Sequence, residues 1–373
     1  MARVITITSG KGGVGKTNIT VNLAIQLARE GFKTCIFDAD LGLANINILL
    51  GVSPEYNLED VICGEKSVRE ILVHHDSGID IIPGGTGAEL LTSLAPEQLS
   101  GLIDTFSCLE EYDFLFFDTS AGISKSVISF CMASMEVMLV VIPEPTSLTD
   151  AYSLLKVLSL NGYKEPVKVI VNQAKNERFA EAVFNKFRET VRKYLPLEIS
   201  YAGCLPADES VAEAVTRQRP FVALYPNGRA SLGVTRIAQN LLGAPLSKLP
   251  DEKMDAFWER YSTFVKRPFQ IPQGRSRTHT SETKTHPPEP KAAAENAPSG
   301  HSVFISQQIL NSLNRLVATT IDISRELSEF RQAIKRPAER GSMDKPGERD
   351  TASQHPPIIA FDFEAYVERK RKS

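Results

Sequence analysis

Cysteine and tryptophan are scarce in this chain of 373 residues, which has five cysteines and a single tryptophan. No two cysteines stand in a C-x-x-C arrangement, so no structural zinc or iron–sulfur site can be drawn within one chain. Single cysteines in apolar surroundings are typical of buried thiols in a reducing compartment. The cysteine pattern therefore argues against a disulfide-linked secreted domain and against an iron–sulfur carrier.

Long apolar runs and a strong net charge are also missing. No run of 18 apolar residues is present, so we expect no membrane-spanning helix. The first ten residues, MARVITITSG, carry one basic residue and alternating threonines instead of the apolar centre of a signal peptide. The formal net charge of −3 gives no general attraction to nucleic acid. These features predict a cytoplasmic protein.

Short apolar runs alternate with segments of helical period up to about residue 245, and an apolar content of 42% is enough for a packed core. Strands with so few polar residues are buried on both faces, as in a parallel sheet covered by helices. Residues 1–245 are therefore predicted to form an α/β domain with a doubly wound, mostly parallel sheet. We expect helices at 17–30 and 176–195, and strands at 3–8, 33–38, 79–83, 113–118, 136–142, 167–172 and 197–203.

The composition changes near residue 268. Residues 269–302 and 337–357 are rich in proline, serine, threonine and charge, and such segments cannot offset the entropy cost of ordering, so we expect disordered linkers. Residues 303–336 between them have a heptad seam, which needs a partner surface. Self-association as a coiled coil, docking on the first domain and docking on another protein all remain open. The seam consists of Ile309, Leu313, Leu316, Thr320, Ile323, Leu327, Phe330 and Ile334.

The sequence GKGGVGKT fits the phosphate-binding pattern G-x-x-x-x-G-K-[ST], and it lies between an expected strand and an expected helix. Its glycines let backbone N–H groups face phosphate oxygens, and the helix N-terminus adds a partial positive charge. Lys16 is placed to reach the β- and γ-phosphates, and Thr17 to ligate Mg²⁺. The predicted ATP-binding residues of this loop are Gly10, Lys11, Gly12, Gly13, Val14, Gly15, Lys16 and Thr17.

Carboxylates follow two of the expected strands. In FLFFDTSAG, Asp118 comes directly after four apolar residues, as in a Walker B motif, and is predicted to reach the metal through water. Asp38 and Asp40 end the strand TCIFD, where a carboxylate can orient water in line with the γ-phosphorus. We predict Thr17, Asp118 and Asp38 as metal ligands. For Asp38, a solvated strand end or a helix cap is the alternative.

Base recognition is expected at a later strand end. Asn172 ends the run VIVN, and its amide can donate and accept hydrogen bonds along the edge of adenine. The loop GCLPADES follows the next expected strand, and its Pro206 and Asp208 are predicted to close over the base and ribose. Asp208 before a helix also fits an N-terminal cap.

On the residues KGGVGKT, the chain resembles the deviant Walker A motif of the MinD/ParA-type ATPases. That family carries a signature lysine at the position of Lys11, and the resemblance implies that Lys11 contacts the phosphates bound by a second subunit. A loop this tight cannot easily aim Lys11 and Lys16 at one γ-phosphate, which agrees with a donor from a partner. The resemblance also implies that Asp40 is the hydrolytic carboxylate, so the predicted catalytic residues are Lys11, Lys16 and Asp40.

Within that family, the chain looks most like the flagellar-number regulators of the FlhG (FleN, YlxH) type. The segments GKTNITVNLA, DADLGLANINILLG, DTSAGIS and PEPTSLTDAYSLLKVL carry this resemblance. It implies a slow, Mg²⁺-dependent and partner-stimulated ATPase that forms a homodimer with ATP. It also implies cycling on the cytoplasmic membrane and control of flagellar number or placement with an SRP-type GTPase (FlhF) and flagellar components.

The segment EKMDAFWERYSTFVKR predicts an amphipathic helix within residues 246–268. We expect its aromatic face to bind the membrane, more strongly when two copies are joined in a dimer. The alternative is a helix packed on the domain core. Residues 358–373, whose aromatics precede four consecutive basic residues, are a second candidate for membrane contact. The predicted membrane-binding residues are Phe257, Trp258, Tyr261 and Phe264.

Two other functions compete with this interpretation. A DNA-segregation or division-positioning ATPase of the ParA/MinD type would need a basic surface, for which Arg217, Arg219, Arg229 and Arg236 are available. An iron–sulfur or nitrogenase-type enzyme on the same scaffold is disfavoured by the missing C-x-x-C motif. Binding to random DNA is therefore the main alternative to test.

Overall fold

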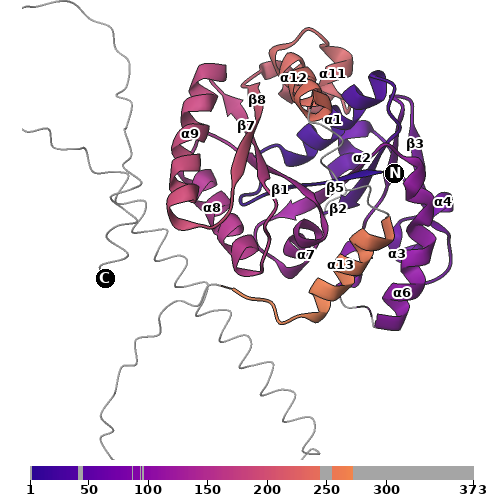
Figure 1. The fold of residues 1–373 in the computed structure, drawn as a ribbon. Coiled ribbons are helices and arrows are strands. Elements are labelled where there is room, and N and C mark those ends of the chain that lie inside the picture. Colours follow the sequence, from indigo (N-terminus) through magenta and orange to yellow (C-terminus); the bar gives the residue numbers. More distant parts are fainter. Residues whose placement is uncertain are drawn as a thin grey trace, which may run out of the picture. The chain divides into compact units, whose positions relative to one another are not determined.

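The computed structural model describes residues 2–40, 45–85, 87–92, 94, 96–243 and 254–271 (Figure 1). Eight strands form one sheet in the order β3-β4-β2-β5-β1-β6-β7-β8, parallel except for the pair β3–β4. The predicted doubly wound, mostly parallel sheet is confirmed. The strands are β1 (Arg3–Ser9), β2 (Thr34–Ala39), β3 (Val73–His75), β4 (Ile79–Ile82), β5 (Phe114–Ala121), β6 (Glu136–Val141), β7 (Val167–Ala174) and β8 (Ile199–Pro206).

Helices cover both faces of this sheet. Successive strand residues point to opposite sides, and since both sets are apolar, both faces are buried under helices. In β5, Phe114 and Phe116 join one core while Leu115 and Phe117 join another. The helices of the first face are α1 (Lys16–Arg29), α2 (Asn45–Leu50), α10 (Glu209–Thr216), α11 (Phe221–Leu224) and α12 (Arg229–Gly243).

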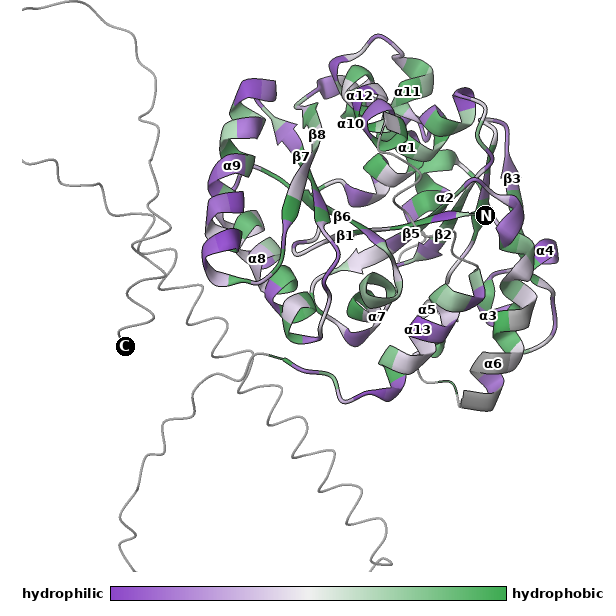
Figure 2. Ribbon diagram, viewed as in Figure 1, coloured by the Kyte–Doolittle hydropathy of each residue, from purple (hydrophilic) through white to green (hydrophobic). Residues whose placement is uncertain are grey.

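The second face carries two apolar clusters. Figure 2 shows hydrophobic residues along α1 and α7 and many hydrophilic ones on α9, which lies at the outside. The other helices are α3 (Leu58–Ile62), α4 (Val68–Ile71), α5 (Gly87–Leu90), α6 (Pro96–Thr105), the 3₁₀ helix η1 (Phe106–Glu111), α7 (Lys125–Ala133), α8 (Pro145–Leu160), α9 (Glu177–Tyr194) and α13 (Met254–Lys266).

The expected strands and helices each have a counterpart, with ends shifted by a residue or more. The sequence reading missed β3, which has only three residues, two of them histidines, and therefore no apolar pattern. Strand β1 lies at the centre, with β2 to β5 on one side and β6 to β8 on the other. In sheets of this kind, ligands bind beyond the carboxyl ends of the strands, at the point where the order reverses.

Helix α13 corrects the prediction of an exposed membrane-binding face. It is amphipathic as expected (Figure 2), but its apolar side chains are buried in the domain. Trp258 stacks on Phe106 with ring centroids 4.5 Å apart, and Phe257 stacks on Phe117 at 4.6 Å. The four residues predicted to face a membrane, and now found in the core, are Phe257, Trp258, Tyr261 and Phe264.

The physical reason is a cluster of aromatic rings that would otherwise be exposed to water. Rings of β2, β5, η1 and α7 belong to this cluster, and α13 packs on them. The Arg260 guanidinium donates to the Ala133 carbonyl at 2.8 Å and so holds α13 to the C-terminal end of α7. None of the helices in the described part of the chain combines the length and the apolar content needed to span a bilayer. The predicted segments 303–336, 337–357 and 358–373 lie outside the described residues, as does the linker 269–302 from residue 272 onward.

Candidate functional site

The glycine-rich loop joins β1 to α1 at the carboxyl edge of the sheet, as predicted. Gly13 and Gly15 have φ angles of 75° and 87°, which favour glycine over other residues. A Cβ at Gly10 would lie 2.2 Å from the carbonyl carbon of Asp150, so the loop also packs too closely on α8 for a side chain there. These glycines therefore have separate geometric reasons to be present.

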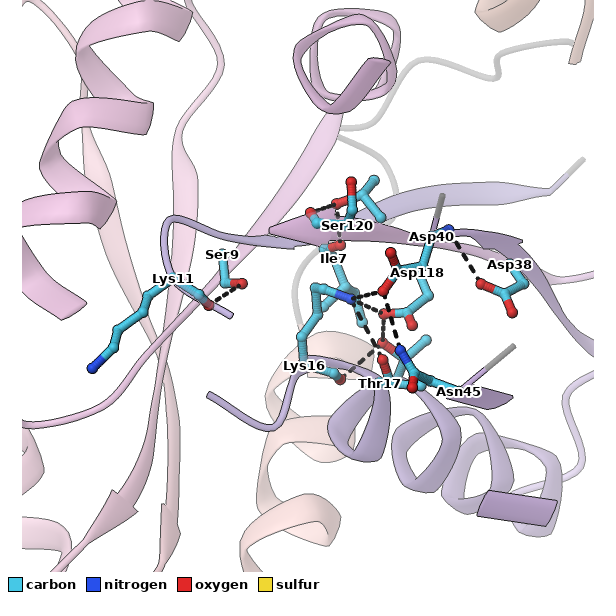
Figure 3. Close-up of polar contacts among 12 residues, drawn as sticks. Ile7, Ser9, Lys11, Lys16, Thr17, Asp38, Asp40, Asn45, Asp118 and Ser120 are labelled. Carbon is cyan, nitrogen blue, oxygen red and sulfur yellow. Dashed lines mark hydrogen bonds and ion pairs between the residues drawn. The ribbon is translucent and has the colours of Figure 1, made fainter. Parts of the chain in front are cut away.

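Lys16 lies in a buried polar cluster at the start of α1 (Figure 3). Its Nζ is 3.1 Å from Asp118 Oδ1, 4.0 Å from Asp40 Oδ2 and 3.5 Å from Thr17 Oγ1. The Thr20 hydroxyl donates to the same Asp118 oxygen at 2.8 Å. The structure thus brings together Lys16, Thr17, Asp40 and Asp118, which the sequence placed on three separate segments.

Asp118 is completely buried in the C-terminal half of β5, and its second oxygen, Oδ2, has no hydrogen-bond partner. A buried carboxylate oxygen left in this state is costly unless a ligand or a cation satisfies it. Oxygen atoms of a carboxylate and a hydroxyl are the ligands that Mg²⁺ prefers. The pair Asp118 and Thr17 therefore fits the predicted magnesium ion.

Asp38 lies beside Asp118, since the two residues are in register on the neighbouring strands β2 and β5. Burial, together with the negative charge of Asp118, raises the pKa of Asp38 to about 8. Its Oδ1 accepts a hydrogen bond from the Asp40 backbone N–H at 3.2 Å. This bond orients the turn that carries Asp40, while direct metal ligation by Asp38 stays a prediction.

Asn45 is a member of the site that the sequence reading missed. It begins α2, and its side-chain amide donates to Asp40 Oδ2 at 3.3 Å (Figure 3). The contact fixes the carboxylate that is predicted to orient water. The signal in the sequence was a polar residue at the start of a helix, five positions after Asp40.

Lys11 lies on the other side of the loop. Figure 3 shows its side chain pointing away from Lys16. The Lys11 ammonium lies 2.9 Å from Glu144 Oε2 and donates to Thr146 Oγ1 at 3.1 Å, both at the start of α8. The Ser9 hydroxyl donates to the Lys11 carbonyl at 3.0 Å. The two lysines of one loop are therefore held by different parts of the domain.

Asn172 lies near the end of β7, and it contacts the glycine-rich loop. Its side-chain amide donates to the Val14 carbonyl at 2.7 Å, and its oxygen accepts from the Gln173 N–H at 2.9 Å. The structure thus places the predicted adenine reader directly against the phosphate loop. Its contact with a base stays a prediction.

Asp208 is used as a helix cap, the alternative reading of the sequence. One of its oxygens accepts from the Ser210 N–H at 3.0 Å, at the start of α10, and the other from the Ala230 N–H at 3.0 Å, in the first turn of α12. Although burial alone would raise the pKa of Asp208, these hydrogen bonds lower it below the usual value. Pro206 pairs with Ala174 at the end of β7. Contacts of Pro206 and Asp208 with ATP stay predictions.

Comparison with known proteins points to one family. The model described as "CobQ/CobB/MinD/ParA nucleotide binding domain" matches residues 5–221. The antiactivator FleN of Pseudomonas aeruginosa is 41% identical over 259 residues, which cover 69% of this chain and 92% of that protein. The flagellum site-determining protein YlxH of Helicobacter pylori is 33% identical over 269 residues, or 70% and 90% of the two chains.

Solved structures of MinD proteins are also similar to this chain. MinD from Pyrococcus horikoshii, complexed with Mg-ADP, has a TM-score of 0.54 and 27% identity, with 66% of this chain and 98% of that chain covered. The MinC:MinD cell division complex of Aquifex aeolicus has a TM-score of 0.52 and 29% identity, with 65% and 96% covered.

Proposed function

The chain belongs to the CobQ/CobB/MinD/ParA family of nucleotide-binding domains, and we propose that it is an ATPase that works as a dimer to regulate flagella. The observation that carries this proposal is the opposite placement of the two lysines in one phosphate loop. Lys16 completes a site within its own subunit. Lys11 faces away from that site and is available to another.

Within one subunit, the loop N–H groups and Lys16 bind the triphosphate. Lys16 then exchanges its present carboxylate partner, Asp118, for phosphate oxygens. Mg²⁺, held by Thr17 and Asp118, would supply positive charge to the phosphate oxygens. Asp40, fixed by Asn45, orients the attacking water and accepts its proton as the bond to the γ-phosphorus forms. The bond between the γ-phosphorus and the bridging oxygen of the β-phosphate breaks, and ADP leaves with that oxygen while the γ-phosphoryl group becomes inorganic phosphate.

Between subunits, Lys11 supplies the missing positive charge. To reach a partner's phosphates, its ammonium leaves Glu144 and Thr146, contacts that are partly exposed and therefore weak. The triphosphate gains a second lysine only in the dimer, so ATP stabilises the dimer and its hydrolysis releases the subunits. Light scattering with ATP, ADP and no nucleotide tests this: a dimer with ATP alone supports it, and a monomer in all three contradicts it.

The relatives FleN and YlxH suggest the cellular role. One is named as an antiactivator and the other as determining the flagellum site, so we propose that this chain controls the number or placement of flagella. The partners would be flagellar components, among them an SRP-type GTPase (FlhF). Pull-down of that GTPase with the ATP form, but not with the ADP form, is the expected result.

Membrane cycling also belongs to the proposal, since the resemblance to MinD implies peripheral binding. Helix α13 cannot use its apolar face for this while it covers the aromatic core. Residues 358–373, with four consecutive basic side chains, are the remaining predicted contact. Deleting them is expected to abolish co-sedimentation of the ATP dimer with anionic liposomes. Unchanged sedimentation would move the contact to a released α13.

DNA binding is the second candidate, and the described arginines speak against it. Arg217 and Arg236 pair with Glu213 and Glu177, and Arg229 donates to a backbone carbonyl. The charges of Arg217 and Arg236 are balanced by these carboxylates, which leaves fewer positive charges on this surface for the phosphates of DNA. Salt-dependent retention of random duplex DNA by the ATP form would reverse this preference.

A further inference from the structure

We propose that Asn172 is a positioning residue of the phosphate loop, in addition to its predicted contact with the base. The inference rests on the proposed function only in that the loop binds phosphates. It concerns the loop itself and makes predictions for ligands that have no base. One buried side chain would then couple the two ends of the nucleotide site.

The first observation is a short hydrogen bond across the sheet. Asn172 is 9% exposed, and its Nδ2 donates to the Val14 carbonyl at 2.7 Å. Strand β7 is separated from β1, which carries the loop, by β6. The amide therefore ties the middle of the loop to a strand that the loop does not otherwise belong to. Val14 is itself 1% exposed, so both partners are kept from water and the bond would be costly to lose.

The second observation is the backbone that aims this side chain. Gln173 has a φ of 55°, in the left-handed region that few residues other than glycine adopt. The pairing of β7 with β8 shifts between Val171 and Ala174, so the ladder is irregular where Asn172 and Gln173 stand. Such irregularities re-aim side chains at functional sites. Here the Gln173 N–H donates to Asn172 Oδ1 at 2.9 Å and fixes the orientation of the amide.

The third observation concerns Gly15, the residue directly before Lys16. A Cβ at Gly15 would lie 2.4 Å from Asn172 Nδ2, so the amide rests against the backbone of the loop. Contact on Gly15 and a hydrogen bond to Val14 together restrain the two residues that lead into Lys16. Removing the amide frees this part of the loop to move, and with it the N–H groups and the ammonium that bind phosphate.

A carboxamide has enough hydrogen-bonding capacity for both tasks. It carries two N–H donors and two acceptor sites on its oxygen, and the contacts above use one of each. One donor and one acceptor site remain for the edge of adenine. Base recognition and loop positioning can therefore occur together.

The test uses tripolyphosphate with Mg²⁺, a ligand that has no base. If Asn172 only reads adenine, Asn172→Ala leaves tripolyphosphate affinity unchanged; if it positions the loop, the affinity falls on the order of fivefold, as for the loss of one buried hydrogen bond. Amide hydrogen exchange in residues 12–17 is expected to be faster in the variant without any ligand. Gln173→Gly, which keeps the left-handed backbone, is the matched control and should bind tripolyphosphate like the wild type.

Wild-type tripolyphosphate affinity together with wild-type exchange in Asn172→Ala would overturn the proposal. If the alanine variant does not fold, Asn172→Leu keeps a similar volume without the hydrogen bonds and is judged by the same two measurements. The proposed function is tested separately by Lys16→Ala, which should lose tripolyphosphate binding altogether. If Lys16→Ala still bound tripolyphosphate, the assignment of the phosphate site would be wrong. The hydrogen-exchange result for Asn172→Ala would still report on the position of the loop.

Discussion

The two ends of the phosphate loop lie in contrasting surroundings. Lys16 is 7% exposed and faces Asp118, which is fully buried, whereas Lys11 is 36% exposed and faces Glu144, which is more than half exposed. Breaking a buried charge pair by removing one partner strongly destabilises a protein, because the other charge stays buried without compensation. An exposed pair contributes only about 0–1 kcal/mol to stability. One lysine is thus fixed in the site of its own subunit, and the other can leave its contacts at small cost. This contrast is the basis of the proposal that Lys11 acts on a second subunit.

The largest effect is expected for Lys16→Ala. It removes the ammonium that we propose binds phosphate and leaves the buried Asp118 carboxylate without its cationic partner. We expect ATP affinity to fall by more than about 100-fold, because a charged hydrogen bond to the ligand and the geometry of the site are both lost. Titration calorimetry measures this. Lys11→Ala is the matched control and should bind ATP as a monomer, so equal losses in both variants would erase the contrast.

Asp40→Ala is expected to separate binding from hydrolysis. The carboxylate is held by Asn45 at the edge of the Lys16 cluster, where it can accept a proton from water. Loss of such a general base lowers turnover by about 100-fold or more, while ATP binding and dimer formation persist. Phosphate release and light scattering on the same sample report both. Turnover at the wild-type rate would remove Asp40 from the reaction.

Asp38→Asn tests whether the buried cluster around Lys16 carries more negative than positive charge, since Asp38 and Asp118 are both buried there. Because the pKa of Asp38 is raised to about 8, the folded chain keeps a proton that the unfolded chain releases above about pH 4. The free energy of unfolding without Mg²⁺ should therefore fall as the pH rises from about 4 to about 8.

The asparagine mimics the protonated acid and should remove that part of the dependence. At pH 8 we expect the variant to gain about 1–2 kcal/mol in the free energy of unfolding, which raises its melting temperature a few degrees above that of the wild type. At pH 5 the difference should be smaller. Asp76→Asn, at an exposed position, is the control. If the free energies of unfolding of wild type and Asp38→Asn changed with pH in the same way, the raised pKa of Asp38 would be contradicted.

The smallest effect is expected at the Lys11 end. Glu144→Gln removes the exposed ion pair but keeps a polar side chain, so Lys11 leaves its resting place more easily. The pair is worth about 0–1 kcal/mol, and each dimer releases two, so dimer formation with ATP should improve by up to about 30-fold. Glu189→Gln, exposed on α9, is the control for the change of charge. Weaker dimers would mean that Glu144 supports the paired state instead.

The phosphate loop and the strands that carry Asp38 and Asp118 could be predicted because local patterns determine them, whereas the ion pair of Lys16 with Asp118 emerged only from the structure. A strand, a glycine turn and a helix have a definite order, and parallel strands bring their ends to one edge. The contact of Lys11 with Glu144 spans 133 positions of sequence, and it depends on tertiary packing such as that of α8 on Gly10. Helix α13 shows another limit. Burial of an aromatic helix face is favourable both in a membrane and in a protein core, so the pattern predicts the helix but does not decide what its apolar face contacts.

Mixing two inactive variants tests the transfer of Lys11 between subunits most directly. In a dimer of one Lys11→Ala chain and one Asp40→Ala chain, the first chain keeps its own Asp40 and receives Lys11 from the second. That one site is complete, so the mixed dimers should recover up to about half of the wild-type turnover, although each variant alone is inactive. If Lys11 acts within its own subunit, neither site is complete, and a mixture as inactive as its components would contradict the account.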